Sequence, residues 1–162
     1  RYNAITPSVC NLRPSSRGFV ALRDANPDSA PLIQPNYLST ESDRAVAVAG
    51  LKMTREIMAA PALQPFTPHE LKPGAHINSD DELALAAGDL GTTIFHPVGT
   101  CKMGNDSMAV VDDELRVKGV QNLRVIDASI MPTITSGNTN APTVMIAEKG
   151  AEFLKRQHQH RS

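Results

Sequence analysis

The sequence has few cysteines and no excess of charge of either sign, and each shortage disfavours a class of protein. Its two cysteines, Cys10 and Cys101, stand far apart without a C-x-x-C pair, so neither a disulfide framework nor a zinc cluster is expected. A single disulfide would be allowed, but we expect reduced thiols. The 16 Lys and Arg residues are scattered and balanced by 17 Asp and Glu residues, which does not suit a nucleic-acid surface. We therefore expect a small-molecule partner and no nucleic acid.

Long apolar runs and phosphate-binding glycine motifs are also missing. The longest apolar runs, such as residues 45–51 and 143–147, fall far short of the roughly 20 residues that span a bilayer, so no membrane span is expected. There is no G-x-G-x-x-G and no G-x-x-x-x-G-K-[ST], hence no dinucleotide fingerprint or P-loop. The first residues, RYNAITPSVCNLRP, show neither an initiator Met nor a signal-peptide pattern. We expect the chain to be a piece of a longer protein.

The apolar residues form short runs at first and helical patterns later. Before residue 39, the runs SVCNL, GFVALRD and PLIQPNYL alternate with Pro, Gly, Asn and Ser, which is typical of strands and turns. A helix is then predicted from Thr40 to about Met58, with a capping-box-like pair formed by Thr40 and Asp43 and a stop at Pro61. Asp43 falls mostly outside the predicted apolar face. That face consists of Val46, Ala49, Gly50, Met53 and Ile57.

The rest of the chain predicts two further helices and two short strands. Several prolines predict an irregular connection over residues 61–78, after which Ser79 and Glu82 form a capping box for a short helix to about Ala87. Strands are predicted at residues 114–117 and 123–126. The last helix is predicted from about Asn140 to Arg156, with Pro142 in its first turn. Its predicted buried face is Val144, Ala147, Ala151 and Leu154.

His96 lies in the stretch TTIFHPVGTCKMG, residues 92–104. An imidazole can take a proton from a hydroxyl group near neutral pH, so His96 is a candidate base. For an arbitrary histidine, the more common role is simply to form hydrogen bonds inside a packed turn. A metal site is disfavoured, because the histidines and Cys101 do not form the close pairs typical of zinc sites.

The stretch SGNTNAPT, residues 136–143, precedes the last predicted helix. Asn138 or Asn140 could be simply the N-cap of that helix. The free N–H groups and partial positive charge of the same helix end could instead hold an anion or an electron-rich carbonyl group. The residues by themselves leave these alternatives open.

Three ordered motifs carry a resemblance to a known family. They are FHPVGTCKMG (95–104), VVDDELRVKGVQNLRVIDASIMP (110–132) and SGNTNAPTVMIAEKGA (136–151). Together they closely resemble the carboxy-terminal signature of the glucose-methanol-choline (GMC) family of flavoprotein oxidoreductases, most of all the bacterial choline and alcohol dehydrogenases. The upstream segments LRPSSRG (12–18) and PNYLSTESD (35–43) are similar to that family's substrate-side part.

The resemblance implies an FAD-dependent alcohol oxidoreductase with a small alcohol as its substrate. In such enzymes the alcohol is oxidised while hydride passes to N5 of the flavin. By resemblance, His96 is the base that takes the alcohol proton, and Asn138 stabilises the substrate oxygen. The residues that match the family's flavin-binding stretches are Asp127, Ala128, Thr139, Asn140 and Thr143.

The implied fold class is an α+β piece of a two-domain flavoprotein. Residues 1–104 would supply part of an antiparallel sheet with helices, the substrate-binding or cap portion. Residues 105–162 would return into the FAD-binding domain as its C-terminal strands and helix. An amino-terminal nucleotide-binding portion, or a chain supplying it, is the implied partner, and the 162-residue chain alone is expected to be inactive. Two alternatives stay open, a hydroxynitrile lyase of the same fold and a catalytically inert assembly lobe.

Overall fold

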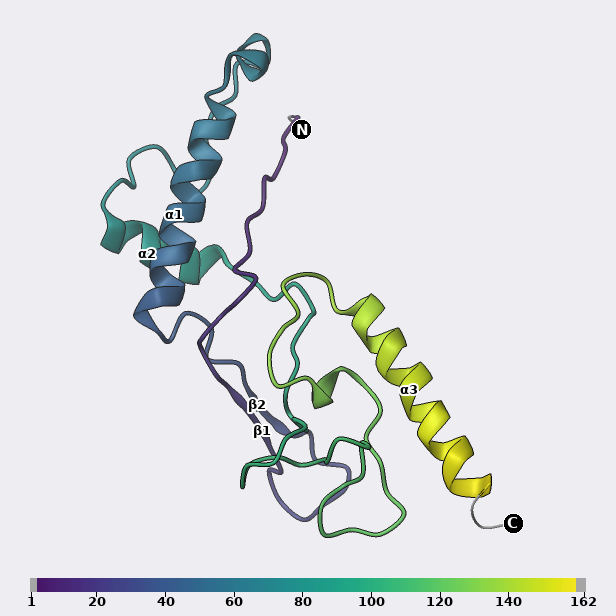
Figure 1. Cartoon of the computed structure of the whole chain (residues 1–162). Coiled ribbons are helices and arrows are strands. Elements are labelled where there is room, and N and C mark those ends of the chain that lie inside the picture. Colours follow the sequence, from purple (N-terminus) through teal and green to yellow (C-terminus); the bar gives the residue numbers. More distant parts are fainter. Residues whose placement is uncertain (1–2, 160–162) are drawn as a thin grey trace. The chain divides into compact units, whose positions relative to one another are not determined.

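The computed structural model describes residues 3–159, and its contacts divide the chain into two compact units, Arg1–Thr92 and Thr93–Ser162 (Figure 1). The first unit contains the strands β1 (Phe19–Ala21) and β2 (Leu32–Gln34), the helices α1 (Glu41–Met58) and α2 (Asp80–Leu90), and the 3-10 helix η1 (Pro61–Phe66). The second contains the 3-10 helix η2 (Ala128–Ile130) and the helix α3 (Asn140–Gln159). Helices with a small antiparallel sheet were predicted, and this part of the fold class is confirmed.

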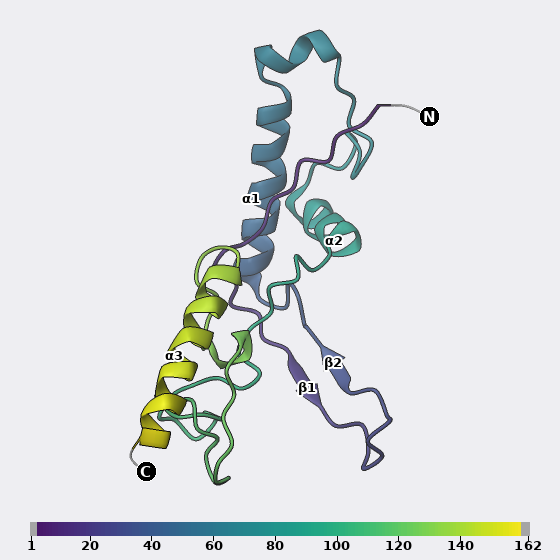
Figure 2. The ribbon, with the colours of Figure 1, turned by 90° about the vertical axis from the view of Figure 1, so that its right-hand side faces the viewer.

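The strands β1 and β2 form an antiparallel hairpin in which Val20 pairs with Ile33. The run GFVALRD and the start of PLIQPNYL therefore do contain strands. The run SVCNL does not, so a strand prediction there is wrong. Its segment passes along α1 instead (Figure 2), where Val9 lies so close to Gly50 that a Cβ added to Gly50 would be 2.8 Å from Val9 Cγ2.

Helix α1 begins and ends as predicted, but its buried face is different. Thr40 is its N-cap, with the hydroxyl oxygen accepting a hydrogen bond from Asp43 N at 3.3 Å. Four of the five predicted face residues, Val46, Ala49, Met53 and Ile57, are exposed, so the face is wrong except for Gly50. The buried positions are Asp43, Val48 and Gly50. The reason is that the segment before β1 supplies hydrogen-bond donors to Asp43, which makes burial of a carboxylate favourable.

Helix α2 has the complete capping box predicted at its start. The Ser79 hydroxyl accepts from Glu82 N at 3.3 Å, and the Glu82 carboxylate accepts from Ser79 N at 3.0 Å. The helix runs to Leu90, three residues beyond the predicted end, and buries Leu83 completely. The connection before it is irregular apart from η1, and Arg55 of α1 holds it through an ion pair with Glu70 at 2.8 Å.

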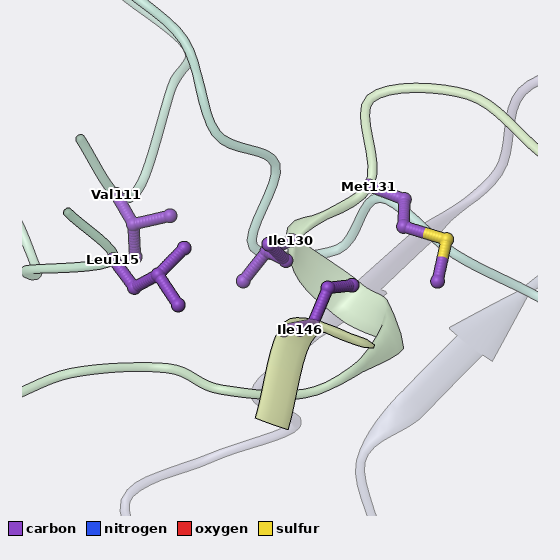
Figure 3. Close-up of a cluster of buried hydrophobic side chains, with 5 residues drawn as sticks. All are labelled: Val111, Leu115, Ile130, Met131 and Ile146. Atoms are coloured by element: carbon purple, nitrogen blue, oxygen red, sulfur yellow. The ribbon is translucent and has the colours of Figure 1, made fainter. Parts of the chain in front are cut away.

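The core of the second unit collects apolar side chains from loops, η2 and α3 (Figure 3). Its buried members are Val111, Leu115, Ile130, Met131 and Ile146. The strands predicted at 114–117 and 123–126 are reduced to isolated bridges such as Arg116 with Arg124, so these two predictions are wrong. Leu115 has a left-handed φ of 66°, which breaks a regular ladder.

Helix α3 begins at Asn140 as predicted, with Pro142 in its first turn, and extends to Gln159. Its predicted buried face is wrong, because Val144 and Leu154 are 54% and 41% exposed. The buried residues Ile146 and Gly150 lie one position earlier, which turns the face by about 100°. Gly150 allows this contact, since a Cβ there would lie 2.5 Å from Ile126 Cγ2.

Both cysteines are free, as expected. Within residues 3–159, none of the helices combines the length and the apolar character needed to cross a membrane. The predicted division at residue 104 concerns the domains of a longer protein and stays a prediction.

Candidate active site around His96

The backbone before His96 makes a sharp turn that separates two side chains. Phe95 has a left-handed φ of 63°, and its N–H donates to the Thr93 hydroxyl oxygen at 3.1 Å. Phe95 is exposed, whereas the next residue, His96, is half-buried. The following Pro97 has a φ restricted by its ring, which stiffens the backbone that presents the imidazole. The short motif therefore directs His96 inward while Phe95 stays at the surface.

The imidazole of His96 contacts the residue that immediately precedes α3. Its Nδ1 lies 2.9 Å from Thr139 Oγ1, and the backbone N–H of Thr139 donates to the same nitrogen at 3.4 Å. Thr139 is 7% exposed. These contacts join two of the sequence motifs across 43 residues. The interpretation of His96 as a hydrogen-bonded residue in a packed turn is thus correct for the Nδ1 side of the ring.

The other ring nitrogen of His96 is differently placed. Within the described part of the chain, no hydrogen bond is found at Nε2 of His96. Among residues 3–159, every buried side-chain nitrogen or oxygen has a hydrogen-bond partner. Because Nε2 of His96 has none, it is not buried and is accessible to solvent. The ring is therefore anchored through Nδ1 and open at Nε2, an arrangement suited to proton exchange with a bound small molecule.

The glycine turn after His96 lies against the segment that contains η2. Cys101 N donates to Ser129 O at 3.0 Å, and Met103 N donates to Ile130 O at 2.8 Å. Gly99 has a φ of 90°, and a Cβ there would lie 3.2 Å from Met131 O. The motif thus needs glycine for both its backbone conformation and this close approach. Residues 95–104 and 127–132 form one local structure although they are separate in sequence.

The N-cap position of α3 is not occupied by an asparagine. The residue before the helix is Thr139, and Asn140 is the first helical residue, so neither Asn138 nor Asn140 takes the predicted N-cap position. The Thr139 carbonyl accepts from Thr143 N at 3.0 Å and from the Thr143 hydroxyl at 2.6 Å. Asn138 and Asn140 are exposed beside this helix end.

Asp127 and Ala128 are placed by a local cap. The Asp127 carboxylate accepts from Ser129 N at 2.8 Å and from the Ser129 hydroxyl at 2.5 Å, which starts η2. The structure therefore joins His96 to Thr139 and Thr139 to Thr143, with Asn138 and Asn140 adjacent in the chain. Asp127 and Ala128 join this site through the neighbouring Ser129, which bonds Cys101 of the glycine turn.

The loop from Lys102 to Lys118 is held by charged pairs. Lys102 Nζ lies 2.9 Å from the Asp106 carboxylate, and its hydrogen bond lowers the pKa of Asp106. Burial raises the pKa of Asp112, but hydrogen bonds from Arg116 and Glu114 outweigh it and lower that pKa overall. Among residues 3–159, no group of three or more His, Cys, Asp and Glu side chains is arranged to hold a metal ion.

A sequence profile described as GMC oxidoreductase matches residues 14–147. The chain belongs to the GMC oxidoreductase family. Similar members include alcohol dehydrogenase [acceptor] of Pseudomonas putida, which is 49% identical over 152 residues, covering 94% of this chain and 28% of that protein. Mitochondrial choline dehydrogenase of Homo sapiens is 53% identical over 148 residues, covering 90% of this chain and 25% of that protein.

Solved structures of GMC oxidoreductases and related flavoenzymes have the same fold over most of the chain. Pyridoxine 4-oxidase from Mesorbium loti aligns with a TM-score of 0.80 and 38% identity over 92% of this chain and 28% of that chain. An FAD-dependent oxidoreductase from Chaetomium thermophilum aligns with a TM-score of 0.85 and 34% identity, covering 91% and 26%. The chain thus spans about a quarter of the length of the relatives that it matches.

The contact between His96 and Thr139 was missed at the level of sequence. Thr139 was matched to the flavin edge, and nothing in its spacing from His96 indicated that the two side chains meet. Their proximity depends on how residues 97–138 fold between them. The nearest signal in the sequence is the family resemblance of both motifs, which groups them in one site without pairing individual atoms.

Proposed function

We propose that this chain carries the substrate-facing part of an FAD-dependent alcohol oxidoreductase, with His96 as the catalytic base. One observation carries the proposal: His96 is held through Nδ1 by Thr139, while Nε2 is accessible. Membership of the GMC oxidoreductase family supports the reaction class, since the relatives named above are alcohol and choline dehydrogenases. The substrate class is a small molecule with a CH–OH group.

In the proposed reaction, the O–H bond of the alcohol breaks and its proton passes to Nε2 of His96. The bonding electron pair stays on the oxygen and forms the C=O bond as the C–H bond breaks. FAD, when bound, accepts the hydride that leaves this carbon. A positioned base of this type contributes about 10²- to 10⁴-fold in rate.

Asn138 is proposed to stabilise the substrate oxygen. Its side-chain amide has N–H donors, which can hydrogen-bond the oxygen as negative charge develops on it. Asn138 is exposed and lies next to Thr139, so it is available to a bound substrate beside His96. An asparagine has no titrating group near neutral pH and does not compete with His96 as a base.

The residues proposed to contact FAD are Asp127, Ala128, Thr139, Asn140 and Thr143. Their placement fits such a group: the 20-residue helix α3 begins among them, and Asn140 is exposed at that end. A helix amino end favours negative charge in its vicinity, which suits the electron-rich edge of a flavin. Because the sequence has no G-x-G-x-x-G motif, we propose that a nucleotide-binding portion, in a longer chain or a second chain, holds the pyrophosphate.

The proposed domain assignment follows from these roles. Residues 1–104 would belong to the substrate side of the enzyme and residues 105–162 to the FAD-binding side. His96 would then stand near the boundary between the two portions. That is where a group must lie to contact the substrate while the substrate faces the flavin.

The test uses the FAD-containing holoenzyme, mixed with choline or a simple alcohol in the absence of oxygen. Loss of the visible flavin absorption band shows that the alcohol reduces the flavin. His96→Ala is expected to slow this bleaching by about 10²- to 10⁴-fold with an unchanged unfolding midpoint. His69→Ala, at an exposed histidine of the first unit, is the matched control.

Three results would contradict the proposal. Equal bleaching by His96→Ala and the unchanged enzyme would exclude His96 as the base. A parallel collapse of activity and folding stability would instead favour a purely structural histidine. A holoenzyme that binds flavin and is never bleached by alcohols would favour the lyase alternative.

A further inference from the structure

Thr139 places two different groups on one nitrogen of His96. Its hydroxyl oxygen is 2.9 Å from Nδ1, a normal hydrogen-bond length, and its backbone N–H reaches the same atom at 3.4 Å. Thr139 is buried and ends the loop at the start of α3, so its position is fixed by the helix that follows. Few residue types could replace Thr139, because the contact needs both a backbone N–H and a side-chain hydroxyl group at this position.

The two groups have opposite requirements. A backbone N–H can only donate, so its contact needs a lone pair on Nδ1 and favours the neutral ring with its proton on Nε2. A hydroxyl group can accept as well as donate, so it also serves the ring with its proton on Nδ1. The second tautomer is the one that leaves Nε2 bare and able to accept a proton. Of the two Thr139 groups, only the hydroxyl can accept a hydrogen bond from Nδ1–H and so satisfy this tautomer.

We propose that Thr139 is a positioning residue for His96: its hydroxyl group accepts the Nδ1 proton and so leaves Nε2 free to take the substrate proton. The catalytic consequence rests on the proposed function of His96 as a base. The role of Thr139 acts through the imidazole and does not require contact with the substrate. When Nε2 takes the proton, the Nδ1–H bond to Thr139 Oγ1 remains, so the charged ring keeps a partner.

Replacement of the hydroxyl group has a defined effect on the ring. In Thr139→Val the shape of the side chain is nearly preserved, but the remaining backbone N–H donor favours the proton on Nε2. Loss of one neutral hydrogen bond corresponds to a change of about 2- to 10-fold in the tautomer ratio. Thr139→Ser keeps the hydroxyl group and is expected to keep the ratio of the unchanged protein.

The tautomer is measured by nitrogen NMR on the whole 162-residue chain labelled with ¹⁵N. Two-bond proton–nitrogen correlations distinguish a protonated ring nitrogen from a bare one, and a pH series through the histidine titration range identifies the neutral ring. His96→Gln assigns the signals by removing them. The neutral ring of the unchanged protein and of Thr139→Ser should carry its proton on Nδ1, and Thr139→Val should move the ratio toward Nε2 by about 2- to 10-fold.

Two outcomes would overturn the proposal: a neutral ring with its proton on Nε2 in the unchanged protein, or an unchanged ratio in Thr139→Val. The first is read without any variant, so it holds even where Thr139→Val fails to fold. The measurement needs neither flavin nor alcohol. Equal bleaching by His96→Ala and the unchanged enzyme would therefore refute His96 as the base, whereas a wrong tautomer would refute the role of Thr139.

Discussion

Asp43 is a buried carboxylate whose ionised form should stabilise the first unit. It is 3% exposed. One carboxylate oxygen accepts from Asn11 Nδ2 at 3.1 Å and Ser15 N at 2.9 Å, and the other accepts from Ser16 N at 2.8 Å. Burial by itself raises the pKa of Asp43, but hydrogen bonds from Ser16 and Ser15 outweigh it and lower the pKa from 3.8 to about 2.

The direction of the pH effect follows from these two pKa values. The folded chain holds the carboxylate ionised more strongly than the unfolded chain does. The stabilisation is therefore fully present above about pH 4 and is lost as the pH falls through the folded pKa of about 2. The difference between 3.8 and about 2, at about 1.36 kcal/mol per pH unit, corresponds to about 2 kcal/mol.

Asp43→Asn is the substitution that tests this network. The amide keeps the shape of the side chain, but its NH₂ group must face donors from Ser15 or Ser16, which leaves buried polar groups unsatisfied. We expect the free energy of unfolding at pH 7 to fall by about 2 to 3 kcal/mol. As the pH is lowered to about 2, the difference from the unchanged protein should shrink by about 2 kcal/mol, because the aspartate then becomes protonated too.

The assay is urea unfolding followed by circular dichroism at a series of pH values. Amide hydrogen exchange of α1 reports on the first unit separately. Asp28→Asn, at an exposed carboxylate in the hairpin connection, is the matched control and should change little. A deficit that stays constant from pH 7 to pH 2, or no deficit at all, would refute the role assigned to the ionised Asp43.

Four other substitutions test packing, capping and chemistry. Gly150→Ala should lower the free energy of unfolding by about 1 to 3 kcal/mol, because its Cβ would meet Ile126. Gly88→Ala, in the open part of α2, should raise the free energy of unfolding by about 0.5 to 1 kcal/mol. Urea unfolding compares the two variants. Ser79→Ala should cost about 1 kcal/mol in the same measurement, since it removes the N-cap of α2. Asn138→Ala in the holoenzyme should slow anaerobic flavin bleaching by roughly 10²-fold, and unchanged bleaching would remove this residue from the proposed site.

Local sequence signals located the helices well and their buried faces poorly. Thr40, Ser79 and Pro142 each act through neighbouring backbone groups, so their effects are visible within a few residues of sequence. The faces of α1 and α3 depend on partners far along the chain, such as Val9 on Gly50 and Ile126 on Gly150. In α3 a glycine adds little to an apolar pattern, so the pattern pointed to the stripe next to Gly150.

For the site, family resemblance by itself groups the motifs around His96 and Asn138. The sequence by itself determined the residue types, the caps and the family, because these depend on identity and short spacing. Only the tertiary structure showed that Thr139 meets Nδ1 of His96 and that Nε2 is open. Hydrogen bonds between side chains 43 residues apart depend on how the intervening loop folds, and ångström-scale distances of that kind have no counterpart in sequence spacing.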